Sequence, residues 1–237
     1  MNTYDELKNR LMAAGASLVG FADFTGAELP DGFDYPGGIS IAVALEPKIL
    51  AGIKDNPTKD YEAEYDLVNA KLNELSYMGE KILTEAGYSA KAITATIHNY
   101  DRANLKAPFQ HKTTAIWAGL GWIGKLDVLV TEQYGSGLRF ATVLTDLSPG
   151  EKDVKPIMES KCGDCVSCAD ACPAGASKRI NWKFGMKRED LIDIMACNES
   201  ITSRVKELGL NRAICGICLV SCPWTRRYID ENIDSGR

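Results

Sequence analysis

The chain has 237 residues, 45% of them hydrophobic, and a formal net charge of −5 at pH 7. Such a chain can bury a substantial core in one large or two small domains. It contains no apolar run near the roughly 18 residues that suggest a membrane span, so we expect no membrane contact. Its first segment, MNTYDELKNRLMAAGA, lacks the basic start and apolar centre of a secretion signal, which predicts a cytoplasmic protein.

The charge is distributed unevenly along the chain. Residues 1–150 carry a net charge of −6 and residues 151–237 a net charge of +1, which together make the total of −5. Because nucleic-acid affinity depends mainly on Lys and Arg contacts with phosphates, the acidic larger part disfavours a nucleic-acid partner. The basic segment SKRINWKFGMKR, residues 177–188, is interpreted as a solvated loop face, with an RNA contact as the less favoured alternative.

The first elements in chain order predict an α/β domain. Thr3 and Glu6 form a capping-box pattern for a helix that ends near Gly15. The apolar segments SLVGFAD, 17–23, and ISIAVAL, 39–45, are predicted to be buried strands separated by a glycine-rich loop.

A long amphipathic helix and a third strand follow. Thr58 is the predicted N-cap of the helix, and apolar residues recur at steps of three and four residues until Gly87. Such a stripe is more often a core face than a cofactor site. The segment AKAITATI, 90–97, predicts another strand, and residues 98–110 predict a loop.

The stretch AGLGWIGKLD, 118–127, contains both G-x-G-x-x-G and most of a phosphate-loop motif. A nucleotide loop leaves a strand and opens a helix, so that the phosphate meets the helix N-terminus. Here a predicted short helix, 111–118, comes first, and a predicted hairpin over 126–146, turning at 134–137, comes after. This order excludes both nucleotide interpretations.

The eight cysteines carry the strongest signal, and all of them follow residue 160. CGDCVSCADACP reads C-x2-C-x2-C-x3-C-P, and CGICLVSCP reads C-x2-C-x3-C-P. In two-cluster ferredoxins, the cysteine before proline crosses over to ligate the other 4Fe–4S cluster and starts a helix. Disulfides and a pair of zinc sites are the weaker alternatives.

The crossover arrangement divides the thiols into two sets of four. The first cluster is predicted to be held by Cys162, Cys165, Cys168 and Cys222. The second is predicted to be held by Cys172, Cys197, Cys215 and Cys218, with Cys197 supplying the ligand that the second run lacks. An oxygen-sensitive, low-potential electron path follows, which suggests an anaerobic setting and a donor such as ferredoxin or flavodoxin. A boundary near 147–154 would separate an α/β domain, 1–150, from a cluster domain, 151–237.

The segment HKTTAIWAGLGWIGK, the Thr145–Asp146 pair and the cysteine pattern together resemble the epoxyqueuosine reductase family. The resemblance covers about residues 38–228 and is closest to short double-cluster proteins of anaerobes, which are also related to reductive dehalogenases. It implies an α/β (α+β) architecture in which a nitroreductase-like domain binds base-off cobalamin and is followed by a bacterial-type two-cluster ferredoxin domain. By this resemblance, the expected corrinoid contacts are Gly119, Gly121, Trp122, Gly124 and Lys125.

The function implied first is an iron–sulfur oxidoreductase that passes electrons through two 4Fe–4S clusters to a bound corrinoid. That corrinoid would reduce a small-molecule or corrinoid substrate. The alternatives are an electron-transfer or binding module without its own catalysis, and a tRNA epoxyqueuosine reductase. Two departures from the tRNA-acting members disfavour the last: their catalytic aspartate would fall near Leu105, and their helical-repeat extension has no counterpart in this sequence.

Four side chains around the 98–110 loop are the candidate proton donors and substrate contacts. These catalytic candidates are Tyr100, Asp101, His111 and Lys112. A general acid must lie within hydrogen-bond reach of the reacting atom. A histidine at a helix start, such as His111, is more often structural.

Overall fold

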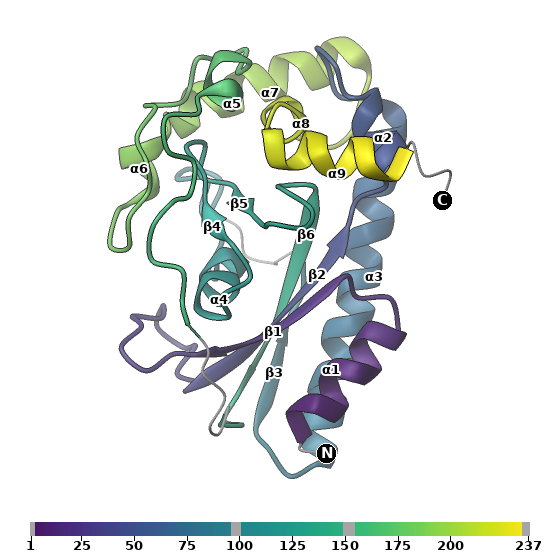
Figure 1. The fold of residues 1–237 in the computed structure, drawn as a ribbon, viewed down its shortest axis with the longest axis vertical. Coiled ribbons are helices and arrows are strands. Elements are labelled where there is room, and N and C mark those ends of the chain that lie inside the picture. The colour runs from purple at the N-terminus through teal and green to yellow at the C-terminus, as the bar shows by residue number, and fades with distance from the viewer. Residues whose placement is uncertain (1–2, 96–100, 149–154, 234–237) are drawn as a thin grey trace. The chain divides into compact units, whose positions relative to one another are not determined.

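The computed structural model describes residues 3–95, 101–148 and 155–233 (Figure 1). The chain divides into two compact units, each assembled from three segments. We call them the sheet unit, Met1–Ala44, Val68–Leu120 and Arg139–Ile157, and the cysteine unit, Leu45–Leu67, Gly121–Leu138 and Met158–Arg237. These units are discontinuous in sequence, whereas the predicted division falls at a single point, residue 150. That division into two domains stays a prediction.

The sheet unit is built on a four-stranded sheet with the strand order β1-β2-β6-β3. Strands β1 and β2 pair antiparallel, as do β3 and β6. The elements of this unit are α1 (Thr3–Ala13), β1 (Leu18–Asp23), β2 (Gly37–Ala44), β3 (Ala90–Ile93), α4 (His111–Trp117), β6 (Leu138–Thr145) and most of α3 (Lys59–Glu85).

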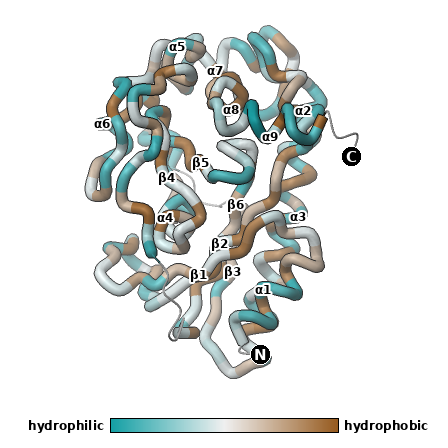
Figure 2. The backbone as a smooth tube through the Cα atoms, viewed as in Figure 1, coloured by the Kyte–Doolittle hydropathy of each residue, from teal (hydrophilic) through white to brown (hydrophobic). Residues whose placement is uncertain are grey.

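The core of the sheet unit lies between the sheet and the helices α1 and α3. Ile39 and Ile41 of β2 are fully buried, as is Leu11 of α1. Gly79 lets α3 approach the sheet closely, because a Cβ there would lie 3.1 Å from a methyl group of Val143 in β6. Figure 2 shows hydrophobic residues along these strands and alternating hydrophobic and hydrophilic residues along α1 and α3. This pattern is what an amphipathic helix on a buried sheet requires.

The cysteine unit consists mainly of short helices and turns. Its elements are α2 (Pro47–Gly52), β4 (Trp122–Ile123), β5 (Leu129–Val130), α5 (Ser167–Asp170), α6 (Arg188–Leu191), α7 (Ile194–Leu208), α8 (Ile217–Val220) and α9 (Pro223–Ile233). The Asp193 carboxylate caps α7 by accepting from the backbone N–H groups of Met195 and Ala196, and the left-handed Gly209 ends that helix. Helix α9 packs on α2, and the Tyr228 hydroxyl donates to the Leu45 carbonyl at 3.0 Å.

Most of the predicted helices and strands of the first 150 residues are confirmed. The Thr58 cap is present, with the Tyr61 N–H donating to its hydroxyl oxygen at 3.1 Å. The predicted strand 90–97 is β3, which ends at Ile93. The helix Pro47–Gly52 was not predicted, although a proline at its first position is a known start signal. Among the described residues, no helix is both long and apolar enough to cross a membrane.

The predicted hairpin over 126–146 is wrong. Strand β5 pairs with the preceding β4, whereas β6 pairs with β3 and lies beside β2 in the larger sheet. The two strands therefore belong to different sheets. Alternating apolar residues predict that a strand exists, but its partner depends on packing with distant segments.

Candidate metal centre

All eight cysteines are free thiols, and all lie in the cysteine unit. The thiols lie close enough to certain others to raise their pKa, and this proximity defines two groups. Cys168 interacts with Cys162, Cys165 and Cys222. Cys218 interacts with Cys172, Cys197 and Cys215, and also with Cys168, so the two groups are neighbours. These groups have the membership that the cysteine spacing predicts, while ligation of a cluster by them stays a prediction.

The environment of the thiols disfavours uncompensated negative charge. Burial, followed by the neighbouring cysteines, raises the pKa of Cys168 and of Cys197 to about 11 each. Burial also raises the pKa of Cys218, with its cysteine neighbours adding to the effect. Thiolates are the form that binds metal, and gathering them here requires a compensating positive charge. Four thiols in each group is the donor set that a 4Fe–4S cluster uses, while no three His, Cys, Asp or Glu side chains among the described residues are arranged to hold a metal ion.

Cys165 differs from the other thiols because it is exposed. Hydrogen bonds from Ser167, first from its hydroxyl group and then from its backbone, lower the pKa of Cys165, and the charge of Lys125 acts in the same direction. The loop that carries it is closed by the Cys165 N–H, which donates to the Cys162 carbonyl at 3.1 Å. This loop is the solvent-facing edge of the first group.

An apolar wall covers one side of the thiols. It consists of the buried residues Leu126, Ala176 and Ile192. Four thiols pack against it together with Ala174, namely Cys168, Cys172, Cys197 and Cys218. Such a wall limits the access of water to the groups it covers.

The two Cys-Pro pairs are followed by different backbone structures. Helix α9 begins at Pro223, directly after Cys222, as predicted. After Cys172 the prediction of a helix is wrong, because the chain instead makes a turn in which the Gly175 N–H donates to the Cys172 carbonyl at 3.0 Å. Gly175 has a φ of +58°, which ends the turn in the left-handed region and prevents a regular helix.

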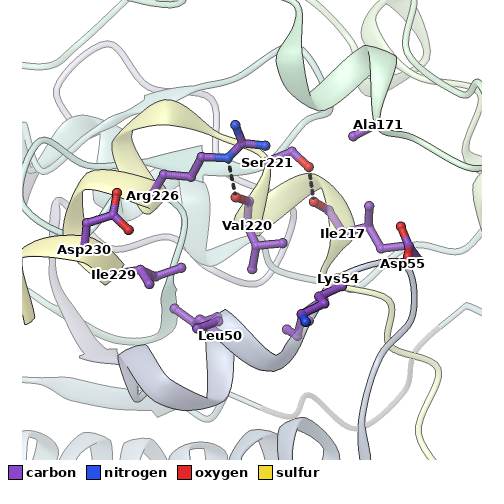
Figure 3. A pocket seen from close by; sticks show the side chains of 12 residues that line it. Leu50, Lys54, Asp55, Ala171, Ile217, Val220, Ser221, Arg226, Ile229 and Asp230 are labelled. Carbon is purple, nitrogen blue, oxygen red and sulfur yellow. Dashed lines mark hydrogen bonds between the residues drawn. The ribbon is translucent and has the colours of Figure 1, made fainter. Parts of the chain in front are cut away.

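A cavity of about 460 Å³ lies among α2, α8 and α9 of the cysteine unit (Figure 3). Its aliphatic lining includes Leu50 and Ile229, and charged side chains such as Arg226 stand at its edge. The Arg226 Nε group donates to the Val220 carbonyl at 3.3 Å. Two of the lining residues, Ala171 and Ser221, immediately precede cysteines, so the cavity reaches the backbone of both cysteine runs.

The glycines of the 118–127 stretch make room for the protein's own backbone. Gly119 has a φ of +67°, and a Cβ there would lie 2.9 Å from the Lys155 carbonyl oxygen. A Cβ at Gly121 would overlap the carbonyl oxygen of Val130, the residue that pairs with Trp122. These contacts account for the glycines without a cofactor.

Trp122 and Lys125 of the same stretch are buried in the cysteine unit. Trp122 is fully buried and packs edge-to-face on Trp224, with ring centroids 5.2 Å apart. Its indole N–H has no acceptor among the described residues. Lys125 is 4% exposed and donates to the Gly163 carbonyl at 2.8 Å.

The structure gives the five residues expected to contact a corrinoid contacts within the protein, and their contact with a corrinoid stays a prediction. Their side chains and glycine positions face the protein itself, and Gly124 lies beside the cysteine loop, where a Cβ would be 3.7 Å from the Cys162 sulfur. The stretch forms part of the scaffold around the first group of thiols.

His111 occupies a structural position in the sheet unit. Its Nε2 lies 3.1 Å from the Thr94 carbonyl oxygen, and its Nδ1 lies 3.0 Å from the Thr142 hydroxyl. Burial lowers the pKa of His111 from 6.5 to about 4. A neutral imidazole with both nitrogens engaged is poorly suited to donate a proton, so the geometry favours the structural interpretation.

Asp101 is exposed and held as an anion by its own loop. Its carboxylate accepts from the backbone N–H groups of Ala103 and Asn104 and from the Asn104 side chain at 2.7 Å. The Asn104 side chain is the main cause that lowers the pKa of Asp101 below 3.8. Lys112 is half-buried in the first turn of α4, and Tyr100 lies outside the described residues.

Comparison with known proteins confirms the resemblance stated above. No family model matches the chain. An epoxyqueuosine reductase of Cyclobacterium marinum is 34% identical over 126 residues, which are 51% of this chain and 38% of that protein. The chain spans about half the length, or less, of the curated relatives it matches, which are named epoxyqueuosine reductases.

Two kinds of solved structure share the fold. An epoxyqueuosine reductase with an epoxyqueuosine-modified tRNA-Tyr stem loop has a TM-score of 0.60 and 22% identity, over 95% of this chain and 66% of the other. A reductive dehalogenase described in terms of B12-dependent dehalogenation has a TM-score of 0.66 and 18% identity, over 95% of this chain and 34% of the other. The mixed α/β fold is thus similar to both kinds of enzyme.

The expectation that a nucleic acid is disfavoured as a partner is wrong. It rested on the net charge of the larger part of the chain, whereas a protein of the same fold carries a tRNA stem loop. Net charge averages over the whole surface, and an RNA contact requires only a local basic face.

We predict that Gly121→Ala destabilises the cysteine unit, because the added Cβ would overlap the Val130 carbonyl oxygen. The expected loss is about 1–3 kcal/mol, as for other overpacked sites. Thermal unfolding and iron content of the anaerobically purified protein would measure it. Gly52→Ala is the matched control, because a Cβ at that position meets nothing within 4 Å. Equal unfolding temperatures and equal iron contents of the two variants would contradict the scaffold role of Gly121.

We also predict that His111 makes the protein less stable as the pH falls. The imidazole has a pKa of about 4 when folded and an ordinary value of 6.5, so acidification protonates the unfolded chain first. Its stabilising contribution should be complete above pH 6.5 and should fall by about 2 kcal/mol between pH 7 and pH 5. Denaturant unfolding at both pH values should show a smaller pH effect in His111→Gln than in the unmodified protein.

Proposed function

We propose that the protein is an iron–sulfur reductase that acts on epoxyqueuosine in tRNA. The observation that carries this proposal is the gathering of eight free thiols into two groups of four, in a chain whose curated relatives are epoxyqueuosine reductases. These relatives favour a tRNA substrate over the small-molecule or corrinoid substrate that the sequence suggested first. The nitroreductase-like and two-cluster ferredoxin domains are part of the proposal, supported by the fold similarity.

Each group of thiols is proposed to hold one 4Fe–4S cluster. The first would be held by Cys162, Cys165, Cys168 and Cys222 and the second by Cys172, Cys197, Cys215 and Cys218. When bound, such clusters supply one-electron transfer. The apolar wall of Leu126, Ala176 and Ile192 keeps water away from the thiols it covers. A low-potential protein such as ferredoxin or flavodoxin remains the proposed electron donor.

A corrinoid remains part of the proposal, and when bound it would supply reducing chemistry at cobalt. The proposal is supported by the fold similarity to a reductive dehalogenase described as B12-dependent. No described side chain is assigned to it, because the residues expected to contact it face the protein interior. We therefore attribute no step of the reaction to this group.

Reduction of an epoxide consumes two electrons and two protons, so a proton donor is required. Asp101 is the proposed donor on its loop, and the Asn104 side chain must first release its carboxylate. Because hydrogen bonds to the charged form lower the pKa, loss of this contact would raise the pKa of Asp101 toward its ordinary value. The electron-transfer module is the second candidate function, favoured because the Asp101 carboxylate is held by Asn104 and both ring nitrogens of His111 are engaged.

The basic segment 177–188 is the proposed contact with the RNA backbone. Lys183 is exposed, and Phe184 beside it is 52% exposed, a combination suited to phosphate contact and base stacking. The Lys183 ammonium lies 3.9 Å from the Glu159 carboxylate, a surface pair that contributes little to stability and can be exchanged for a phosphate contact.

We expect the anaerobically purified protein to contain two 4Fe–4S clusters and to convert an epoxyqueuosine-containing tRNA stem loop when given cobalamin and a low-potential donor. Iron and sulfide analysis would count the clusters, and mass spectrometry of the nucleosides would detect the reaction. A matched stem loop with unmodified guanosine is the control. Two clusters without conversion would favour the electron-transfer module instead.

We predict that Lys183→Ala weakens stem-loop binding and lowers the slope of log K against log salt by about one unit, as expected for the loss of one phosphate contact. Lys81→Ala is the matched control, because Lys81 is exposed to a similar degree and lies 3.8 Å from Glu85 in a comparable surface pair. Equal binding by both variants would show that Lys183 does not contact the RNA.

A further inference from the structure

Lys125 is a buried cation within the cysteine unit. Its side chain crosses to the loop between Cys162 and Cys165 and donates to the Gly163 carbonyl at 2.8 Å. The Asn181 side-chain amide donates to the same carbonyl at 3.0 Å. Only 4% of Lys125 is exposed, so little water screens its charge.

The ammonium group of Lys125 has no carboxylate partner within 4.0 Å among the described residues. Its charge lies beside the first group of thiols, because Gly163, whose carbonyl it binds, follows Cys162 directly and precedes Cys165 by two residues. The second group has a different neighbour, because the cation near Cys215 is Arg204. The Arg204 guanidinium is engaged by the Asp55 carbonyl and the Asn56 side chain at the exposed surface, where water weakens its effect.

We propose that Lys125 is a positioning residue that holds the Cys162–Cys165 loop and stabilises the reduced state of the first cluster. This inference rests on the cluster assignment of the proposed function. Reduction adds one electron, taken from a low-potential one-electron donor, and one negative charge to the site. No bond or proton changes at Lys125. A fixed positive charge in a poorly hydrated environment favours the more negative state, so it makes this cluster easier to reduce.

The test is a redox titration of the full anaerobic protein followed by electron paramagnetic resonance. In Lys125→Gln, the equilibrium constant for reduction of one cluster should fall at least tenfold, which is about 59 mV in midpoint potential. The midpoint potential of the other cluster should be unchanged. Lys125→Arg keeps the positive charge, so the midpoint potential of the first cluster should stay close to that of the unmodified protein.

Lys161→Gln is the matched control. Lys161 immediately precedes Cys162, but its side chain is 48% exposed and its charge is paired with Glu132 at 2.7 Å. Its loss should change neither equilibrium constant by more than about twofold, because water and the partner already screen the charge.

Asn181→Asp provides a second variant in case Lys125→Gln loses iron. It retains the lysine but places a carboxylate beside its ammonium group, so it should lower the same midpoint. Unchanged midpoints in both variants would overturn the inference. Loss of the first cluster from both would also overturn it, since Lys125 would then serve assembly alone. Fewer than two clusters in the unmodified protein would instead refute the cluster assignment.

Discussion

The structure depends on the gathering of eight thiols in the cysteine unit, seven of them partly buried. Burial and mutual repulsion raise the pKa of thiols such as Cys168 and Cys197, so the ligand form is favoured only with a compensating positive charge. The apolar wall and the buried ammonium of Lys125 surround this centre. Metal binding and folding of this unit are therefore expected to be strongly coupled, since the centre supplies the charge that the chain alone lacks.

The stretch 118–127 shows how one sequence pattern can serve several purposes. Its glycines match nucleotide motifs, and the family resemblance suggested contact with a corrinoid. In the structure they permit close approach of backbone to backbone, at Lys155 for Gly119 and at Val130 for Gly121. Lys125 and Leu126 then extend the stretch to the thiols. Glycine identifies a close approach but does not say which group approaches.

The net charge led to the wrong conclusion about a nucleic-acid partner, because it was summed over a long segment of the chain. The acidic first 150 residues disfavoured RNA, yet the basic segment 177–188 lies in the other part of the chain. The sequence identified His111 only as a titratable residue near a loop, and it did not show that this side chain is buried. Its burial and its contacts with Thr94 and Thr142 come from strands that are distant in sequence.

The sequence by itself determined the features that depend on local spacing. The caps and periodicity of α1 and α3, the apolar runs of β1 and β2, the division of the cysteines into two sets and the family resemblance could all be read from it. Only the tertiary structure decided the partner of β5, the assembly of each unit from three separate segments, the turn after Cys172 and the burial of Trp122 and Lys125. The physical reason is that helices, caps and ligand spacing arise from neighbouring residues. Strand pairing and burial depend on contacts between segments far apart in the chain.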